Sequence, residues 1–319
     1  MRSGGGGLLD VEVPAALAGE RVDKAVALLA DLPRSAVTDL VDAGAVLLDG
    51  EVVTTRSRIL AAGQRLQAAI PAIVADEPRP DREVVFEVVY EDDDLIVVDK
   101  PAGLVVHHGA GHRGGTLVDG LLHRYPELAD LPGAGAGEPA RPGIVHRLDK
   151  GTSGLLVVAR SPAAFQSLSA QLREHTAGRF YQTLVIGSVE SDAGVVDAPI
   201  GRSSRLPTRM TISHQGRPAR TNYRVLDRFN LPEELTLLEA SLETGRTHQV
   251  RVHLAAIGHP VVGDDRDRGA VNRPLAGALP NGRLFLHAFR LTLDHPRGDR
   301  LTWESPLPAD LQGVLARLS

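Results

Sequence analysis

The segment 146–154 places one carboxylate between two cations, directly before an apolar run. Asp149 has Arg147 and Lys150 as near neighbours, and the run Leu155–Ala159 follows. Positively charged neighbours favour the ionised form of a carboxylate, which is suited to act as a nucleophile or a base. A solvated surface loop could carry the same Arg-Asp-Lys run, so this pattern alone leaves both interpretations open.

Lysine is rare in this chain, which makes its positions informative. The three lysines are Lys24, Lys100 and Lys150, and arginine supplies nearly all of the remaining positive charge. Lys100 and Lys150 each follow an aspartate beside an apolar, strand-like run. A compact ammonium, rather than the forked guanidinium of arginine, is therefore favoured at these two positions.

Several segments of the chain match, in order, the motifs of one enzyme family. They are YEDDDLIVVDKPAGLVVH (90–107), HRLDKGTSGLLVVAR (146–160), GRFYQTLVIG (178–187), LETGRTHQVRVHLAAIGHPVVGD (242–264) and LFLHAFRL (284–291). Together they resemble the motifs of the RluA/RluD-type pseudouridine synthases, which isomerise uridine within RNA.

The resemblance implies an α+β catalytic domain over residues 83–319, built on a mixed, mainly antiparallel sheet. Strand-like segments around 195–228, 235–243, 249–255 and 284–293 favour the same architecture. The implied reaction breaks the C–N glycosidic bond and forms a C–C bond at C5 of the base. Because it needs neither redox chemistry nor external energy, no cofactor is expected.

The same resemblance gives Asp149 the role of catalytic carboxylate. It would attack the ribose or base covalently or abstract a sugar proton, and the sequence leaves both routes open. The target nucleotide must be flipped out of its stack, at a cost of about a few kcal/mol. Arg147 would fill the resulting gap, and Tyr181 would stack on the extruded uracil and could relay the C5 proton.

The segment 249–255 is expected to be a strand, in which residues two apart share a face. Gln249, Arg251 and His253 would then lie on one side, and Arg251 is expected to face Asp149 and keep it ionised. Arg246, in the turn before the strand, is the expected phosphate contact. Two further residues within the matched motifs, His146 and Lys100, are expected to bind substrate.

Arginine is concentrated between residues 201 and 228, where the only acid is Asp227. The arginines are Arg202, Arg205, Arg209, Arg217, Arg220, Arg224 and Arg228. A solvated hairpin could carry these charges, but the imbalance favours a surface that faces a polyanion. By resemblance this region is a mobile hairpin that grips an RNA stem, with Arg205 and Arg209 as contacts.

Residues 11–70 are predicted to form a separate small α/β domain, after a flexible N-terminus (1–10) and before a proline-bearing linker (71–82). Two amphipathic stretches, near 21–29 and 35–43, precede two short strands joined by Asp49-Gly50. The order resembles the RNA-binding domain named after a small-subunit ribosomal protein. Strong RNA affinity is not expected, because the surface is acidic; the residues concerned are Asp31, Asp39, Asp42, Asp49 and Glu51.

Composition limits the remaining possibilities. The net charge of −5 argues against indiscriminate nucleic-acid binding, and the absence of cysteine excludes disulfides and zinc–cysteine sites. No apolar run approaches the ~20 residues of a membrane helix, so a cytoplasmic location without membrane partners is expected. The histidines fit no zinc-binding spacing, and no metal is expected; they are His107, His108, His112, His248, His253 and His259. The oligomeric state is not readable, and a monomer is favoured.

The leading hypothesis is therefore pseudouridine formation in structured RNA, with the N-terminal domain pointing to large-subunit ribosomal RNA. Alternatives are a transfer-RNA synthase and a catalytically idle RNA-binding ribosome-assembly factor. An aspartate-nucleophile hydrolase would need a second carboxylate or magnesium site beside Asp149. Departures from the family pattern occur at His108, at Asp265–Arg268, and at Arg179, where lysine is common.

Overall fold

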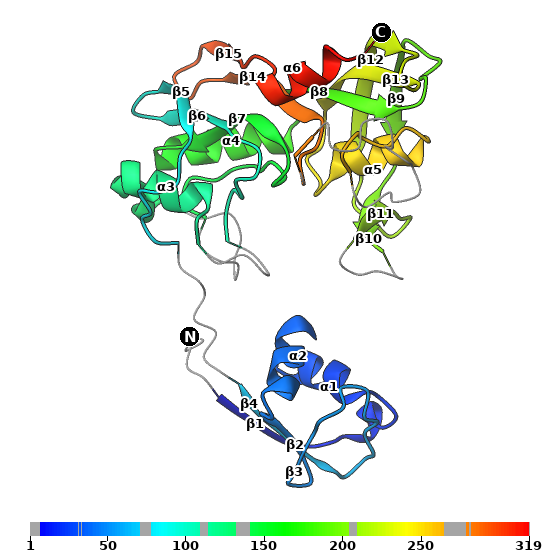
Figure 1. Ribbon diagram of the computed structural model, residues 1–319. Coiled ribbons are helices and arrows are strands. Elements are labelled where there is room, and N and C mark those ends of the chain that lie inside the picture. Colours follow the sequence, from blue (N-terminus) through cyan, green and yellow to red (C-terminus); the bar gives the residue numbers. More distant parts are fainter. Residues whose placement is uncertain are drawn as a thin grey trace. The chain divides into compact units, whose positions relative to one another are not determined.

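The computed structural model describes residues 7–30, 32, 34–70, 78–108, 114–131, 141–203, 209–264, 279–280 and 282–318. The chain divides into two compact units, Met1–Ala75 and Asp76–Ser319 (Figure 1). Each unit has its own buried apolar core. None of the helices in these ranges has the length and apolar character needed to cross a bilayer.

The first unit is a four-stranded antiparallel sheet packed against two helices. Its elements are β1 (Gly7–Glu12), η1 (Ala15–Leu17), α1 (Val22–Leu29), α2 (Arg34–Asp42), β2 (Val46–Leu48), β3 (Glu51–Val52) and β4 (Arg65–Ile70), with strand order β1-β4-β2-β3. The predicted hairpin is present, because Asp49 and Gly50 both adopt the left-handed conformation between β2 and β3.

The N-terminal end of this unit differs from the predicted boundary, whereas its last described strand, β4, ends at Ile70. β1 begins at Gly7, inside the range expected to be a flexible N-terminus, because it pairs along its whole length with β4. Residues 1–6 and 71–77 lie outside the described residues. The end of the predicted linker belongs to the second unit, where the backbone N–H groups of Arg79 and Asp81 donate to Asp119.

The second unit is built on a nine-stranded mixed sheet within the described residues. Its elements are β5 (Glu87–Glu91), β6 (Leu95–Lys100), α3 (Leu117–Arg124), η2 (Pro126–Asp130), β7 (Ser153–Ala159), α4 (Pro162–Arg173), β8 (Gly178–Ile186), β9 (Ala193–Asp197), β10 (Ile200–Arg202), β11 (Met210–Ile212), β12 (Arg220–Phe229), β13 (Leu235–Leu242), α5 (Gln249–Ala256), β14 (Leu286–Asp294), β15 (Arg300–Glu304) and α6 (Ala309–Leu315).

The strand order is β5-β6-β7-β14-β8-β13-β12-β9, with β15 paired to β14. Of these pairings β7–β14 is parallel and the others are antiparallel, so the predicted mainly antiparallel α+β architecture is confirmed. β10 and β11 form a separate two-stranded hairpin, which projects beyond the main sheet in Figure 1.

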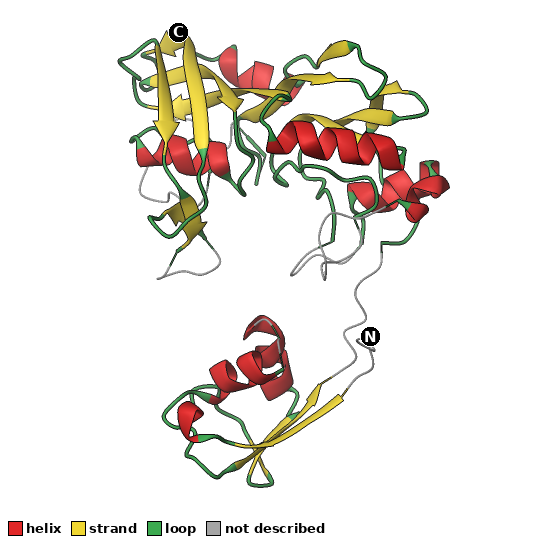
Figure 2. Cartoon of the chain, turned by 180° about the vertical axis from the view of Figure 1, so that it is seen from behind, coloured by secondary structure: helices red, strands yellow, loops and turns green. Residues whose placement is uncertain are grey.

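Helices cover both faces of the sheet in each of its halves (Figure 2). In β6, Ile96 and Val98 pack in the same cluster as α3, whereas Leu95 and Val97 pack with α4. All residues of β7 are buried, as expected for a strand without a solvent face. In the other half, α5 shares a cluster with Tyr181, and α6 packs on the opposite side.

The ends of the helices follow from local sequence. Ser161 caps α4 by accepting a hydrogen bond from the Ala164 N–H, and Pro162 occupies the first turn. The segment 249–255 was predicted to be a strand and this prediction is wrong, because residues Gln249–Ala256 form α5. The alternating Val250 and Val252 suggested a strand, but an eight-residue window is too short to separate the two periodicities, and packing decides.

A buried polar cluster joins α3 to the segment that precedes it. Asp119 is 1% exposed and accepts hydrogen bonds from the Thr116 N–H and hydroxyl, from the Arg79 N–H and from His108 Nε2. Burial alone would raise the pKa of Asp119, but these hydrogen bonds outweigh it and lower the pKa below the ordinary aspartate value.

We expect Asp119→Asn to lower the free energy of unfolding at pH 7 by about 1–3 kcal/mol, because an amide replaces an ionised acceptor that serves several donors. A lowered folded-state pKa stabilises the fold above the unfolded value near 3.9 and loses this effect as pH falls through the folded pKa. Urea unfolding at pH 7 and below pH 4 should therefore show the difference between variant and wild type shrinking on acidification. Asp192→Asn is the control, since Asp192 is exposed and pairs with Arg228 at the surface; an equal loss in both variants would contradict the assignment.

Candidate active site

A cavity of about 350 Å³ lies between the loop before β7, one end of β8 and the start of α5. This volume is within the range of pockets that bind small organic molecules. Several predicted site residues line it together: Asp149, Tyr181, Arg251, His146, Arg147 and Arg246. The cavity therefore brings together residues that lie up to about a hundred positions apart in the sequence.

The charge of Asp149 is met by an arginine from α5. Arg251 Nη1 donates to Asp149 Oδ2 at 3.0 Å, as the sequence predicted, although the arginine is on a helix instead of a strand. The other edge of the guanidinium makes a bidentate pair with Asp264, with Nε–Oδ2 at 2.7 Å and Nη2–Oδ1 at 2.6 Å. Burial acts to lower the pKa of Arg251, but the two carboxylates outweigh it and raise the pKa.

The side chains that flank Asp149 in the sequence have other surroundings than the carboxylate. Lys150 is exposed, and the guanidinium of Arg147 lies 3.2 Å from His107 Nε2. The second ring close to the carboxylate is that of His248, whose Nε2 lies 3.8 Å from Asp149 Oδ1. Asp149 therefore contacts the charged side chain of Arg251 in α5 and the titratable ring of His248.

The loop that carries Asp149 is held by its backbone. The Gly103 N–H donates to Lys150 O at 2.7 Å, and Arg283 Nη1 donates to Gly151 O at 2.9 Å. Gly154, where β7 passes β14, has φ +112°, and a Cβ there would collide with the backbone of Ala288. Glycine is required at this position because of both its dihedral angle and the close approach of β14.

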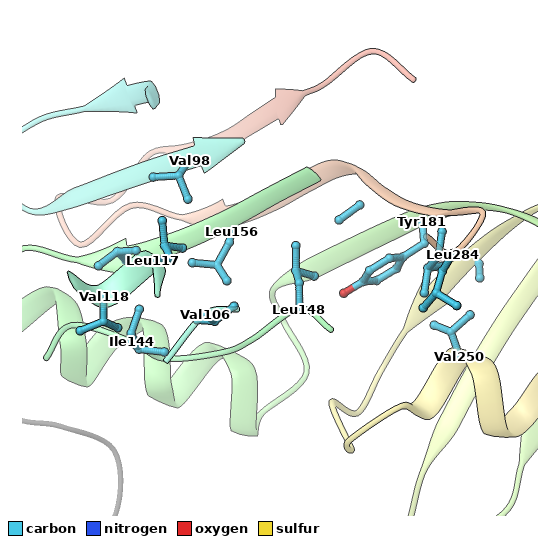
Figure 3. Close-up of a cluster of buried hydrophobic side chains, with 14 of the residues drawn as sticks. Val98, Val106, Leu117, Val118, Ile144, Leu148, Leu156, Tyr181, Val250 and Leu284 are labelled. Atoms are coloured by element: carbon cyan, nitrogen blue, oxygen red, sulfur yellow. The ribbon is translucent and has the colours of Figure 1, made fainter. Parts of the chain in front are cut away.

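Tyr181 lies on β8 between Ala240 of β13 and Ala288 of β14, and it is 5% exposed. Figure 3 shows its ring between Leu148 and Leu284, with the hydroxyl directed toward Leu148. Burial raises the pKa of Tyr181, the charge of Arg179 opposes this rise, and Asp149 adds to it. The ring can present a face to a planar base that enters the cavity.

His146 lines the cavity and also forms a hydrogen bond that supports the cavity wall. Its Nε2 accepts a hydrogen bond from the Val157 N–H at 3.1 Å, which assigns the ring proton to Nδ1. Burial and the nearby charge of Arg179 lower the pKa of His146 to about 3, so the ring is neutral at physiological pH. A neutral imidazole can donate from Nδ1 but adds no positive charge to the cavity.

Lys100 was predicted to bind substrate, but the structure does not bring it to the cavity wall. It is 0% exposed, and its ammonium donates to Pro101 O and Leu104 O at 2.8 and 2.9 Å. Burial lowers its pKa to about 7, although the charge of Asp149 acts in the opposite direction. Its contacts indicate that Lys100 supports the turn after β6.

The arginine-rich surface has a smaller excess of positive charge than the count of arginines along the chain suggested. Arg220, Arg224 and Arg228 of β12 pair with acids that other segments supply; these are Asp197 with Glu243, Glu239 and Asp192, respectively. Antiparallel pairing places these acids opposite the arginines, which a one-dimensional count cannot register. Arg209 is exposed beside β11, and Arg205 lies outside the described residues.

Three residues that matter for the site were not predicted. Asp264 and Arg283 fix Arg251 and the Asp149 loop, and Arg179 contributes a buried guanidinium to the cavity wall. Asp264 ends a matched motif and Arg179 was noted only as a departure from the family pattern. Buried charge partners of this kind are recognisable only when the fold brings them together.

One group of possible metal ligands occurs away from the cavity. In the described part of the chain, the three residues that gather suitable atoms are Asp92, Asp94 and His295. Both oxygens of Asp92 already accept hydrogen bonds, from backbone N–H groups, Tyr90 and His295. None of the three lines the cavity, and the cluster is explained by these hydrogen bonds. His112 lies outside the described residues, as do Asp265–Arg268.

Comparison with known proteins agrees with the geometry. Residues 94–256 match the family described as RNA pseudouridylate synthase, and residues 20–66 match the S4 domain. A large-subunit ribosomal pseudouridine synthase D of Nitrosomonas europaea is 43% identical over 311 residues, which cover 96% of this chain and 87% of that protein. An uncharacterized RNA pseudouridine synthase of Chloroflexus aurantiacus is 46% identical, covering 97% and 93%.

Solved structures show the same relationship. Human RNA pseudouridylate synthase domain containing 4 superimposes with a TM-score of 0.56 at 28% identity, covering 73% of this chain and 94% of that one. The family match spans the loop of Asp149, β8 with Tyr181 and the whole of α5. The chain therefore belongs to the RNA pseudouridylate synthase family.

Proposed function

We propose that this protein isomerises uridines of large-subunit ribosomal RNA to pseudouridine, with Asp149 as the catalytic carboxylate. The observation that carries this proposal is the ion pair of Asp149 with Arg251 inside a cavity that also contains Tyr181. The choice of RNA rests on relatives named as large-subunit synthases and on the S4 domain. A cytoplasmic location and a monomeric state, both expected from the sequence, are also part of the proposal.

The reaction needs one carboxylate that stays ionised and keeps its orientation. Arg251 holds one oxygen of Asp149, and the bidentate Asp264 prevents the guanidinium from rotating. The other oxygen, Asp149 Oδ1, faces the more distant His248 and is the one available to a ribose or base. This arrangement serves both covalent attack and abstraction of a sugar proton, and atoms balance in either route because product and substrate are isomers.

The remaining cavity residues are proposed to hold the extruded nucleotide. Tyr181 would stack on the uracil, and base–aromatic stacking contributes about 1–3 kcal/mol. Arg147 is exposed at the cavity rim, where a planar guanidinium can occupy the gap in the RNA stack. The Nε of Arg246 already donates to Pro218 O, which leaves its Nη groups for a phosphate.

We expect Asp149→Asn to abolish pseudouridine formation in unmodified ribosomal RNA, lowering the rate by about 10²–10⁴-fold or more, since the amide is neither a nucleophile nor a base. RNA affinity should stay within about threefold, because the change is nearly isosteric. Pseudouridine mapping and filter binding measure the two quantities. Undiminished modification would exclude Asp149 as the catalytic group, and modification by neither protein on any RNA would favour an idle assembly factor. Modification of transfer RNA in place of ribosomal RNA would support the transfer-RNA alternative.

Arg251→Lys tests whether the forked geometry is needed. Lysine keeps the charge but cannot join Asp149 and Asp264 through three nitrogens, so the single-turnover rate should fall by about tenfold or more, equivalent to at least ~1.4 kcal/mol. Arg290→Lys is the control, because Arg290 pairs with Glu304 at the surface, and it should stay within about twofold. Equal rates for both variants would show that charge alone suffices.

The arginines of the hairpin are tested through salt dependence. Replacing Arg205 and Arg209 by alanine should weaken RNA binding and reduce the slope of log K against log salt by about 0.7–0.9 for each phosphate that the variant no longer neutralises. Arg224→Ala is the matched control, since Glu239 already neutralises this arginine. If the double variant keeps the wild-type slope, this hairpin is not part of the RNA interface.

A further inference from the structure

Arg179 and Tyr181 are neighbours on the same face of β8. Residues two apart in a strand point the same way, and both side chains are buried while the residues on either side are partly exposed. Both also line the cavity that contains Asp149. The mechanism above gives Tyr181 a role and leaves Arg179 without one.

The guanidinium of Arg179 is held in place by backbone groups. It is 6% exposed, and its Nη2 donates to Glu243 O at 3.1 Å and to Leu242 O at 3.4 Å, at the end of β13. Gly245 leaves room for it, because a Cβ at that position would lie 2.6 Å from Nη1. Two backbone carbonyls therefore fix the orientation of the Arg179 side chain, and the missing side chain of Gly245 gives it space.

This buried cation lacks a counter-ion among the described residues. No ion pair joins Arg179 to a carboxylate among those residues, and its buried Nε has no hydrogen-bond partner in that part of the chain. Burying an unpaired charge is costly, and burial does lower the pKa of Arg179, an effect that Tyr181 opposes. Such an uncompensated charge is suited to stabilise an anion that exists only during the reaction.

The charge of Arg179 acts on two neighbouring groups, His146 and Tyr181, and Tyr181 is the one that shares its strand face. Its pKa is raised by burial, is lowered by Arg179 and is raised again by Asp149. Its register partners on the strands on either side are the uncharged Ala240 and Ala288. The titratable and charged groups that line the same cavity from other described segments come from the loops before β7, from the α5 region and from α4; they are His107, Arg141, His146, Arg147, Asp149, Arg246, His248, Arg251 and Arg173.

We propose that Arg179 is a positioning residue that acts through Tyr181, stabilising its phenolate when the C5 proton of the re-attached uracil is removed. The proposal rests on the function proposed above. In that step the C5–H bond breaks and its electron pair re-forms the C5=C6 double bond. The displaced N1=C6 electrons pass to N1, which takes a proton from solvent, while the C5 proton moves to the phenolate oxygen and returns to solvent from there.

The test is a double-mutant cycle of Arg179→Met and Tyr181→Phe, followed by tritium release from RNA that carries 5-tritiated uridine, under single-turnover conditions from pH 6 to 9. Arg179→Met should slow release by about tenfold for each unit by which the Tyr181 pKa rises. The rising limb of its pH–rate profile should move to higher pH, while the RNA concentration for half-maximal rate stays within about twofold. Arg179→Lys keeps the charge and should restore most of the rate and the wild-type profile.

The cycle separates this role from direct binding of substrate. If Arg179 acts through Tyr181, the double variant should be no slower than Tyr181→Phe alone. Multiplicative effects, or an unshifted pH profile in Arg179→Met, would overturn the proposal and indicate contact with the uracil itself.

Arg300→Met controls for the loss of a positive charge, because Arg300 is an exposed arginine that pairs with Asp294. Arg179→Gln, which keeps a donor for the backbone carbonyls, replaces methionine if thermal unfolding shows a misfolded variant. A wild-type protein that releases no tritium would instead contradict the proposed function.

Discussion

The bridge from Asp264 through Arg251 to Asp149 is the interaction on which the site depends. A guanidinium that is 9% exposed would be costly without partners, and its two carboxylates would repel each other without it. Each of the three charges is therefore offset by its neighbours in the bridge. The geometry also gives the carboxylates different tasks, since Asp264 uses both oxygens on Arg251 and Asp149 uses only one.

The architecture of the sheet explains why this bridge can form. Asp149 precedes β7, whereas Arg251 and Asp264 lie on and after α5, so the two sides come from different halves of the sheet. The junction is β14, which pairs with β7 on one side and with β8 on the other. Gly154 permits the close approach of β7 to β14, and Val261 bridges to Val185 of β8 shortly before Asp264. Backbone pairing thus sets the distance between the charges.

The sequence predicted the class of fold and the contact of Arg251 with Asp149, but not the secondary structure that carries Arg251. Arg251 was placed opposite Asp149 although its segment was assigned to a strand; the motif located the residue and the short alternating pattern misled about the backbone. The arginine count in β12 failed for a related reason, because the neutralising Asp192, Glu239 and Glu243 are adjacent only across strands. Lys100 shows that a rare residue type can equally mark a structural position, as its ammonium binds two carbonyls.

The charges around the cavity also limit what the chemistry can be. Among the described residues, arginines from β8, α5 and the segment before α5 line the same space as one carboxylate, Asp149. An isomerisation that passes through an anionic base benefits from such an excess of fixed positive charge, because cations already in place need no reorganisation when negative charge develops. A hydrolase that activated water with a second carboxylate would need one beside Asp149, and among the described residues Asp149 is the carboxylate that lines the cavity. The excess of cations over anions in this space is thus a physical reason, separate from family membership, to favour rearrangement of a bound base over hydrolysis.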